Sequence, residues 1–351
     1  MHPTEFLRPA VRAVPAYVPG QQPAPGQRVI KLNTNENPYP PSPRVLAALR
    51  EAVGESVRLY PDPEARAVRA RAAALYGVTP DHVMVGNGSD ELLALLLRAT
   101  IDPGDRVAFP IPTYSLYETL VAVQGGTLHT VPFPEDFALP PALAAAQARL
   151  TFLCNPNSPS GTCTPRIEIE RLARAVAGLL VVDEAYVDFA GEHALSLVGR
   201  VPNVVVLRTL SKSYSLAGLR VGLLVAHPDL VAGLRTVKDS YNVNRLSLAA
   251  AEAALDDQAH MEANVARIRA TREGLTAGLE RLGYAVLPSA ANFVLARRRG
   301  SDQAPICRAL AERGILVRHF AQPGLREALR ITVGTDAEIA TLLEALGHLV
   351  A

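Results

Sequence analysis

The sequence has no excess of charge of either sign and no long apolar run. Its 35 basic and 34 acidic side chains leave a formal net charge of +1 over 351 residues. Such a balance gives no electrostatic support for binding nucleic acid or an anionic membrane surface. No apolar stretch approaches the roughly 20 residues that a membrane-spanning helix needs. We therefore expect neither a nucleic-acid partner nor a membrane-embedded segment.

Cysteine is scarce, with only Cys154, Cys163 and Cys307 in the chain. They form no C-x-x-C pair and no metal-ligand cluster, and an odd number argues against a disulfide framework. Prolines interrupt the first 20 residues, so we also expect no secretory signal. These features predict a cytoplasmic, enzyme-sized protein without a bound metal.

The order of the apolar segments predicts an α/β fold with two domains, for which the chain is long enough. Short, almost wholly apolar strands alternate with helices, which indicates a three-layer sandwich with a mostly parallel sheet covered on both faces. We expect these strands at 81–85, 106–109, 150–153, 179–182, 204–207 and 221–225. We expect helices at 43–53, 64–76, 92–100 and 165–177.

The composition changes near residue 250, where Ala- and Arg-rich helices are expected over 249–282. Strands at 292–295, 314–317 and 329–333 and a helix at 336–350 follow. This predicts a smaller α+β domain over 249–351, after a large domain over 43–248. The first 42 residues are rich in Pro and Gly, and we expect an extended arm that joins the small domain.

Lysine is also scarce, since the chain has only Lys31, Lys212 and Lys238. Lys212 alone lies between two serines, with Arg220 eight residues further on. Upstream, an apolar strand ends at Asp183. A lysine can condense with an aldehyde, an aspartate can pair with a ring nitrogen, and serine and arginine can bind a phosphate. Together they favour pyridoxal 5′-phosphate as a cofactor.

Other segments have both a functional and an ordinary interpretation. The turn at 86–90 opens an expected helix, where glycines and free N–H groups favour a phosphate, although the same turn is common without a ligand. Arg220 and Arg330 carry planar forks that suit phosphate or carboxylate, although an arginine on a strand is more often in a surface ion pair. The apolar run before Asp183 also matches a Walker B strand. That function requires a G-x-x-x-x-G-K-[ST] loop, and no lysine here lies in one.

In this order, the motifs resemble those of the fold-type I pyridoxal-phosphate aminotransferases and, within them, the histidinol-phosphate branch. The similarity runs from Tyr17 to Gly334, nearly the whole chain. The motifs that carry it are 17–20, 32–38, 60–63, 88–91, 112–114, 155–161, 183–186, 211–212, 240–244, 291–293, 317–318 and 329–334.

The resemblance implies roles toward the cofactor. Lys212 would bond covalently to it and then move a proton at the substrate α-carbon. Asp183 would pair with the pyridine nitrogen, and Tyr186 would hydrogen-bond the 3′-oxygen. Tyr60 would reach the cofactor phosphate of a neighbouring subunit, which implies a homodimer. The other implied cofactor contacts are Ser89, Asp90, Tyr114, Asn157, Ser158, Thr209, Ser211 and Arg220.

For the substrate, the resemblance implies that Arg330 takes the anionic end, the carboxylate of glutamate or the phosphate of histidinol phosphate. Arg318 would be a second phosphate contact, with Tyr17 and Asn37 nearby. The implied reaction of histidine biosynthesis converts histidinol phosphate and 2-oxoglutarate to imidazole-acetol phosphate and glutamate. Transamination of aromatic amino acids and decarboxylation of threonine phosphate are alternatives on the same fold. A non-catalytic ligand sensor usually carries a DNA-binding module, and no spare basic domain exists here.

One motif departs from the family pattern. The family loop most often reads Asn-Pro-Thr-Gly, with the Asn on the cofactor 3′-oxygen, whereas this chain has Ser-Pro-Ser-Gly at 158–161. Either Ser158 or Asn157 could supply the missing contact.

Overall fold

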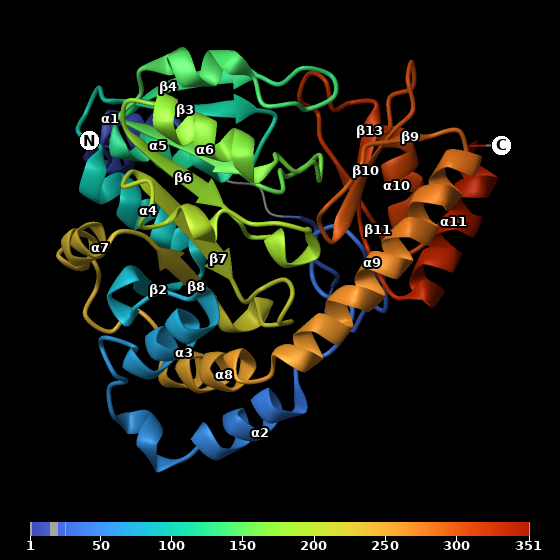
Figure 1. Cartoon of the computed structure of the whole chain (residues 1–351). Coiled ribbons are helices and arrows are strands. Elements are labelled where there is room, and N and C mark those ends of the chain that lie inside the picture. The colour runs from blue at the N-terminus through green and yellow to red at the C-terminus, as the bar shows by residue number, and fades with distance from the viewer. Residues whose placement is uncertain (1, 15–19, 25, 351) are drawn as a thin grey trace.

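The computed structural model describes residues 2–14, 20–24 and 26–350 (Figure 1). In this part of the chain a seven-stranded sheet has the order β2-β8-β7-β6-β5-β3-β4. β8 runs antiparallel to β2 and β7, and the other neighbours are parallel. The strands are β2 (Val83–Asn87), β3 (Arg106–Ile111), β4 (Thr127–Pro132), β5 (Leu150–Cys154), β6 (Leu179–Asp183), β7 (Val204–Thr209) and β8 (Val221–Val225).

Helices cover both faces of this sheet because its side chains alternate between two apolar cores. Val205 and Leu207 of β7 belong to one core, and Val204 and Val206 belong to the other. The first core includes α4 (Ser89–Thr100), α5 (Leu116–Gln124) and α7 (Pro228–Arg235). The second includes α6 (Arg166–Ala175) and the 3-10 helices η4 (Pro141–Ala146) and η6 (Leu195–Leu197). A third core joins α2 (Pro43–Ala52), α3 (Arg66–Tyr76) and α8 (Arg245–Leu255) to β2 and β8.

A second, antiparallel sheet has the order β12-β13-β10-β9. Its strands are β9 (Ala285–Val286), β10 (Phe293–Arg297), β12 (Arg318–His319) and β13 (Ala328–Thr332). It shares a core with α9 (Gln258–Arg281), α10 (Ala304–Glu312) and α11 (Asp336–Val350), which lie together in Figure 1. The predicted fold class, a mostly parallel α/β sandwich with a smaller α+β part, is confirmed.

The N-terminal region lies beside the second sheet and against a helix that covers the large one. β1 (Ile30–Lys31) pairs in parallel with β11 (Ile315–Leu316), beside the second sheet. Further upstream, α1 (Pro9–Ala13) lies against α5, and Arg8 donates a hydrogen bond to the carbonyl of Val123. The remaining short helices are η1 (Pro3–Phe6), η2 (Glu55–Arg58), η3 (Pro80–His82), η5 (Val187–Phe189) and η7 (Ala217–Leu219).

Strand register brings several chain ends to one edge of the large sheet. Asp183 ends β6 opposite Leu207 of β7, and Gly222 near the start of β8 lies opposite both Thr209 and Gly86. The segment after β7, the start of β8 and the first turn of α4 therefore meet at this edge. In open α/β sheets, ligands bind at such a meeting point of strand ends.

Candidate active site

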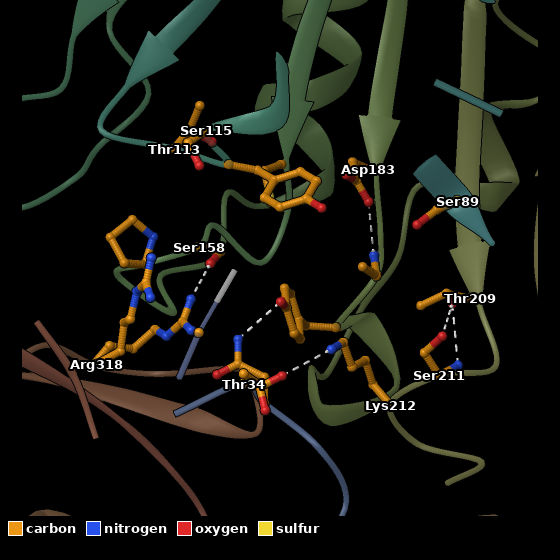
Figure 2. Close-up of a pocket in the computed structure, with 18 of the residues that line it drawn as sticks. Thr34, Ser89, Thr113, Ser115, Ser158, Asp183, Thr209, Ser211, Lys212 and Arg318 are labelled. Carbon is orange, nitrogen blue, oxygen red and sulfur yellow. Dashed lines mark hydrogen bonds between the residues drawn. The ribbon is translucent and has the colours of Figure 1, made fainter. Parts of the chain in front are cut away.

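A pocket at this edge gathers most of the residues predicted from the sequence. Figure 2 shows Ser89, Thr209 and Ser211 on one side of it and Arg318 and Ser158 on the other, with Asp183 and Lys212 between. The predicted residues that line the pocket are Ser89, Asp90, Tyr114, Ser158, Asp183, Tyr186, Thr209, Ser211, Lys212, Arg220, Arg318 and Arg330.

Lys212 reaches into the pocket from the segment that follows β7. Its Nζ donates to the carbonyl of Thr34 at 3.4 Å and lies 5.8 Å from the centre of the Tyr186 ring. Burial, with the nearby positive charge of Arg330, lowers the pKa of Lys212 to about 8. A substantial fraction of the amine is therefore neutral and nucleophilic near neutral pH.

Asp183 is buried at the end of β6, with only 3% of its surface exposed. Its Oδ2 accepts a hydrogen bond from the Tyr117 hydroxyl at 2.7 Å, and its Oδ1 accepts one from the backbone N–H of Ala185 at 3.2 Å. Burial raises the pKa of Asp183 to about 6, although both hydrogen bonds oppose the change. A carboxylate in this setting is a strong partner for a cationic ring nitrogen.

The first turn of α4 and Arg220 form one corner of the pocket. A Cβ at Gly222 would lie 2.5 Å from the backbone nitrogen of Ser89, and one at Gly88 would lie 2.6 Å from Nη2 of Arg220. Only glycine at these two positions lets β8, the helix start and the guanidinium approach so closely. Asp90 accepts from Arg220 at 3.2 Å and from the Tyr114 hydroxyl at 3.1 Å. Free N–H groups at the start of a 12-residue helix, beside an arginine, suit a phosphate.

The hydroxyl groups of Thr209 and Ser211 complete this corner. They lie 2.9 Å apart, and the N–H of Ser211 donates to Thr209 Oγ1 at 3.2 Å. Both residues are buried and belong to the segment that carries Lys212.

Tyr186 lies just after β6, where its hydroxyl accepts a hydrogen bond from Asn35 at 3.0 Å. Burial raises the pKa of Tyr186 to about 12, against the opposing effects of Arg330 and Asn35. Its hydroxyl is therefore a neutral hydrogen-bond donor at physiological pH.

Two arginines lie on the opposite side of the pocket. Arg318 on β12 and Arg330 on β13 are directly paired across the antiparallel ladder. The guanidinium carbons of both lie 5.4 Å from the centre of the Phe320 ring. Arg330 donates to Ser158 Oγ at 3.2 Å and to the carbonyl of Asn33 at 2.9 Å. Two guanidinium groups on paired strands suit a substrate with a carboxylate or phosphate end.

Three predicted residues lie elsewhere in the described structure. Asn157 is buried behind the pocket wall, where it accepts from the Thr113 hydroxyl at 2.7 Å and donates to Ser160 Oγ at 2.9 Å. Asn37 supports the lysine segment by donating to the carbonyl of Lys212 at 3.0 Å. Tyr60 is 76% exposed. Tyr17 lies outside the described residues.

Sequence reasoning missed several residues that surround the predicted ones. Asn33, Thr34 and Asn35 line the pocket through their contacts with Arg330, Lys212 and Tyr186. The polar run at 33–37 belongs to one of the motifs that carry the family resemblance, and of its residues only Asn37 is among the predicted site residues. Phe320 and Gln322 also line the pocket, and no sequence signal distinguished them. Tyr117 is also absent from the predicted residues, although it follows the Pro-Thr-Tyr motif by three residues.

A largely buried ion-pair network lies near this edge of the sheet. Arg208 on β7 donates to Glu184 at 2.7 Å and to Asp188 at 3.0 Å. Asp188 in turn accepts a hydrogen bond from the hydroxyl of Ser213, next to Lys212. Burial raises the pKa of Glu184, and Arg208 opposes this effect. The network therefore ties the segment after β6 to the segment that carries Lys212.

The donor set fits pyridoxal 5′-phosphate. A buried carboxylate, an amine of lowered pKa, a tyrosine hydroxyl and a glycine-lined helix start occupy one pocket, and each matches one functional group of that molecule. The described residues contain no cluster of His, Cys, Asp and Glu that could hold a metal ion. None of the helices in the same part of the chain combines the length and apolar character needed to cross a bilayer.

Known proteins agree with this geometry. The family model described as aminotransferase class I and II matches residues 27–346. The chain belongs to this family. It is 48% identical over 347 residues to histidinol-phosphate aminotransferase 1 of Nostoc sp., covering 99% of this chain and 98% of that protein. It is 48% identical over 340 residues to the histidinol-phosphate aminotransferase of Geotalea uraniireducens, covering 97% and 98%.

A solved structure extends the similarity to the fold. Histidinol-phosphate aminotransferase from Sinorhizobium meliloti, in complex with pyridoxal 5′-phosphate, superimposes with a TM-score of 0.89 at 31% identity. The match covers 98% of this chain and 97% of that one. The family predicted from the sequence is thereby confirmed.

Proposed function

We propose that this protein is a pyridoxal 5′-phosphate-dependent histidinol-phosphate aminotransferase of histidine biosynthesis. It transfers the amino group of histidinol phosphate to 2-oxoglutarate, which yields imidazole-acetol phosphate and glutamate. The observation that carries the substrate assignment is the cross-strand pair of Arg318 and Arg330 in the pocket that holds Lys212. The names of relatives that are 48% identical over nearly the whole chain support it.

The residues divide the work of holding the cofactor. The start of α4 at Ser89 and Asp90, with Ser211 and Arg220, binds the phosphate, and Thr209 supports Ser211. Asp183 would hold a proton on the ring nitrogen, and Tyr186 would donate to the 3′-oxygen. Tyr114, held by its hydrogen bond to Asp90, would pack against the ring. The bound cofactor supplies an electron-withdrawing ring that stabilises negative charge at the substrate α-carbon.

Lys212 would hold the cofactor through its amine and would move the proton at the substrate α-carbon. Its pKa of about 8 suits a group that must both accept and return a proton near neutral pH. Arg330 and Arg318 bind the anionic end of either substrate and hold the α-carbon near Nζ of Lys212. Ser158 accepts a hydrogen bond from Arg330, and so it belongs to the substrate side of the site.

We also propose that the protein forms a homodimer. Near the end of α2, four residues in a short stretch are strongly exposed: Val53 (65%), Val57 (59%), Leu59 (50%) and Tyr60 (76%). Tyr60 stacks on Tyr241 with ring centres 4.3 Å apart, which holds the ring at the surface. This apolar surface suits a second copy of the chain, with Tyr60 at the partner's cofactor phosphate.

Mixed dimers test the role of Tyr60. Lys212→Ala and Tyr60→Ala homodimers are each expected to be impaired. A heterodimer of the two has one site with an intact Lys212 and an intact Tyr60 from the other chain. Activity of that heterodimer well above both parents supports the proposal, whereas no recovery contradicts a contribution across the interface.

The proposal also includes the division of the chain into domains and the location of the protein in the cell. Residues 43–248 form the large domain and 249–351 the small one, with residues 1–42 as an arm, so that the cofactor groups and the two arginines come from different domains. The cytoplasmic location is supported by three unpaired cysteines. Cell fractionation tests it.

The substrate assignment is tested by single-turnover assays on the purified, cofactor-loaded protein. Histidinol phosphate and 2-oxoglutarate are each expected to convert the enzyme in their half-reaction, faster than phenylalanine. Arg318→Gln should raise the KM for histidinol phosphate by about 10- to 100-fold, the loss of one charged contact. Arg171→Gln, at an exposed position on α6, is the matched control. Faster turnover of phenylalanine, or carbon dioxide release from threonine phosphate, would reject the assignment.

A further inference from the structure

Tyr117 is a fully buried tyrosine that lies next to the pocket without lining it. It belongs to α5, and none of its surface is exposed. Its ring stacks on Phe152 with centres 4.6 Å apart and an interplanar angle of 11°. Phe109 and Tyr114 contact it edge-on at 5.7 and 5.5 Å. Three aromatic contacts therefore hold the ring and fix the direction of its hydroxyl.

That hydroxyl makes one short contact, with the carboxylate of Asp183. The distance from Tyr117 Oη to Asp183 Oδ2 is 2.7 Å, typical of a strong hydrogen bond to a charged oxygen. Oδ1 is held by the N–H of Ala185, so each oxygen of the carboxylate has its own donor. Both donors favour the ionised form and restrict rotation of the carboxylate plane.

We propose that Tyr117 is a positioning residue that keeps Asp183 ionised and oriented toward the cofactor ring nitrogen. The inference rests on the proposed function for its catalytic meaning, but its physical basis is the contact between two buried side chains. Without the hydroxyl, one carboxylate oxygen would be buried beside an apolar ring. A buried carboxylate that loses a hydrogen bond to its charged form becomes easier to protonate. A protonated Asp183 could no longer accept the hydrogen bond of a pyridinium nitrogen.

The other groups around Asp183 do not replace this donor. Glu184, the next residue, and Asp90 on α4 add negative charge and raise the pKa of Asp183 further. Cys154, its neighbour on β5, has a pKa raised by burial and donates to the carbonyl of Pro156. Arg208 on β7 is directed to Glu184. Lys212, one of the cationic side chains in the pocket, donates to the carbonyl of Thr34 instead.

Titration of the cofactor-free protein tests the proposal without any assumption about substrate. Aspartate is labelled with carbon-13 at its carboxyl carbon, and the Asp183 signal is identified by its loss in Asp183→Asn. In Tyr117→Phe the titration midpoint should lie about one pH unit or more above that of the unmodified protein. Tyr284→Phe is the matched control, since Tyr284 is also buried and donates to Gln303 at 2.9 Å in the small sheet's core. It should leave the midpoint unchanged.

A second variant keeps the ring in place if Tyr117→Phe does not fold. A 3-fluorotyrosine at position 117 has a more acidic hydroxyl and donates a stronger hydrogen bond. It should move the midpoint in the opposite direction, to lower pH. An unmoved midpoint in either variant, or an equal shift in Tyr284→Phe, would overturn the proposal.

Kinetics then separate this inference from the proposed function. In the loaded enzyme, Tyr117→Phe should lower kcat about 10-fold with little change in the KM of either substrate. If the midpoint moves but unmodified protein does not convert histidinol phosphate, the proposed function fails and the role of Tyr117 stands. If the protein converts histidinol phosphate but the midpoint does not move, only the role of Tyr117 is rejected.

Discussion

Burial moves the pKa of two residues in the pocket in opposite directions. It lowers the pKa of Lys212 to about 8 and raises that of Asp183 to about 6. In each case the low-polarity surroundings disfavour the charged form. Near neutral pH the amine is therefore partly neutral, whereas the carboxylate remains mostly ionised.

The pH dependence of cofactor capture follows from the lysine. Condensation with an aldehyde requires the neutral amine, so the capture rate by cofactor-free protein should rise with pH and level off above about 8. Stopped-flow absorbance across this range measures it. A rate that still rises where an ordinary lysine titrates, near 10.5, would contradict the lowered pKa.

The stability of cofactor-free protein should depend on Asp183 with a definite sign. Its folded pKa of about 6 lies above the ordinary value of 3.8, so the folded state holds this proton more tightly than the unfolded state. The carboxylate is thus destabilising above pH 6, and the penalty disappears as the pH falls from about 6 to about 4. Asp183→Asn should therefore raise the free energy of unfolding at pH 8 by up to about 3 kcal/mol.

Urea denaturation at fixed protein concentration measures this effect. The difference between Asp183→Asn and unmodified protein should shrink toward zero near pH 4. If the difference in the free energy of unfolding were the same at all pH values, ionisation of Asp183 would not be its cause.

At the scale of elements, the close contact of β8 with the start of α4 determines the shape of the corner proposed to bind the cofactor phosphate. Gly222→Ala would place a Cβ 2.5 Å from the backbone nitrogen of Ser89. The helix start must then shift, which should weaken binding of pyridoxal 5′-phosphate about 10-fold and cost about 1–3 kcal/mol in stability. Fluorescence titration with the cofactor measures the first effect.

Gly233→Ala is the control for this prediction. Gly233 lies within α7, and a Cβ there meets no atom within 4 Å. Its cofactor affinity should be unchanged, and its stability should rise by about 0.5–1 kcal/mol because alanine favours a helix. Equal affinity loss in both variants would contradict the steric argument.

The ion-pair network on β7 gives a second prediction at this scale. Arg208→Met leaves the buried Glu184 and the partly buried Asp188 without their cationic partner. It should reduce the free energy of unfolding by about 3–5 kcal/mol. Arg171→Met, which breaks an exposed pair with Glu168, should cost at most about 1 kcal/mol. Denaturant unfolding measures the free energy of unfolding of both variants. Similar decreases would show that the network of Arg208 contributes no more to stability than an exposed ion pair.

The elements that the sequence predicted share strong local signals. The expected strands at 150–153, 179–182 and 204–207 are wholly buried or nearly so, and they match β5, β6 and β7. β4 was missed because it lies at the sheet edge, where polar and exposed residues break the apolar pattern. α5 was missed because it has only nine residues and includes Thr and Val, which are weak helix formers.

At the scale of the whole molecule, the sequence predicted the pocket residues that lie in recognisable motifs. It did not predict contacts between segments that are far apart in the chain. Asn35 is an example, because no local sequence pattern indicates its partners. Its side chain donates a hydrogen bond to Tyr186, and its N–H donates to Thr332, 297 residues away. Such partners follow only from the packing of β1 beside the second sheet.

This long-range closure sets a limit on when the enzyme can first work. The residues around Asn35 are translated long before the partners that hold them, Leu316, Arg330 and Thr332. Until the second sheet has been synthesised, one wall of the pocket is missing. Catalytic competence therefore begins only after the second sheet has been synthesised, and a chain that stops before it has no finished pocket with which to act on a metabolite.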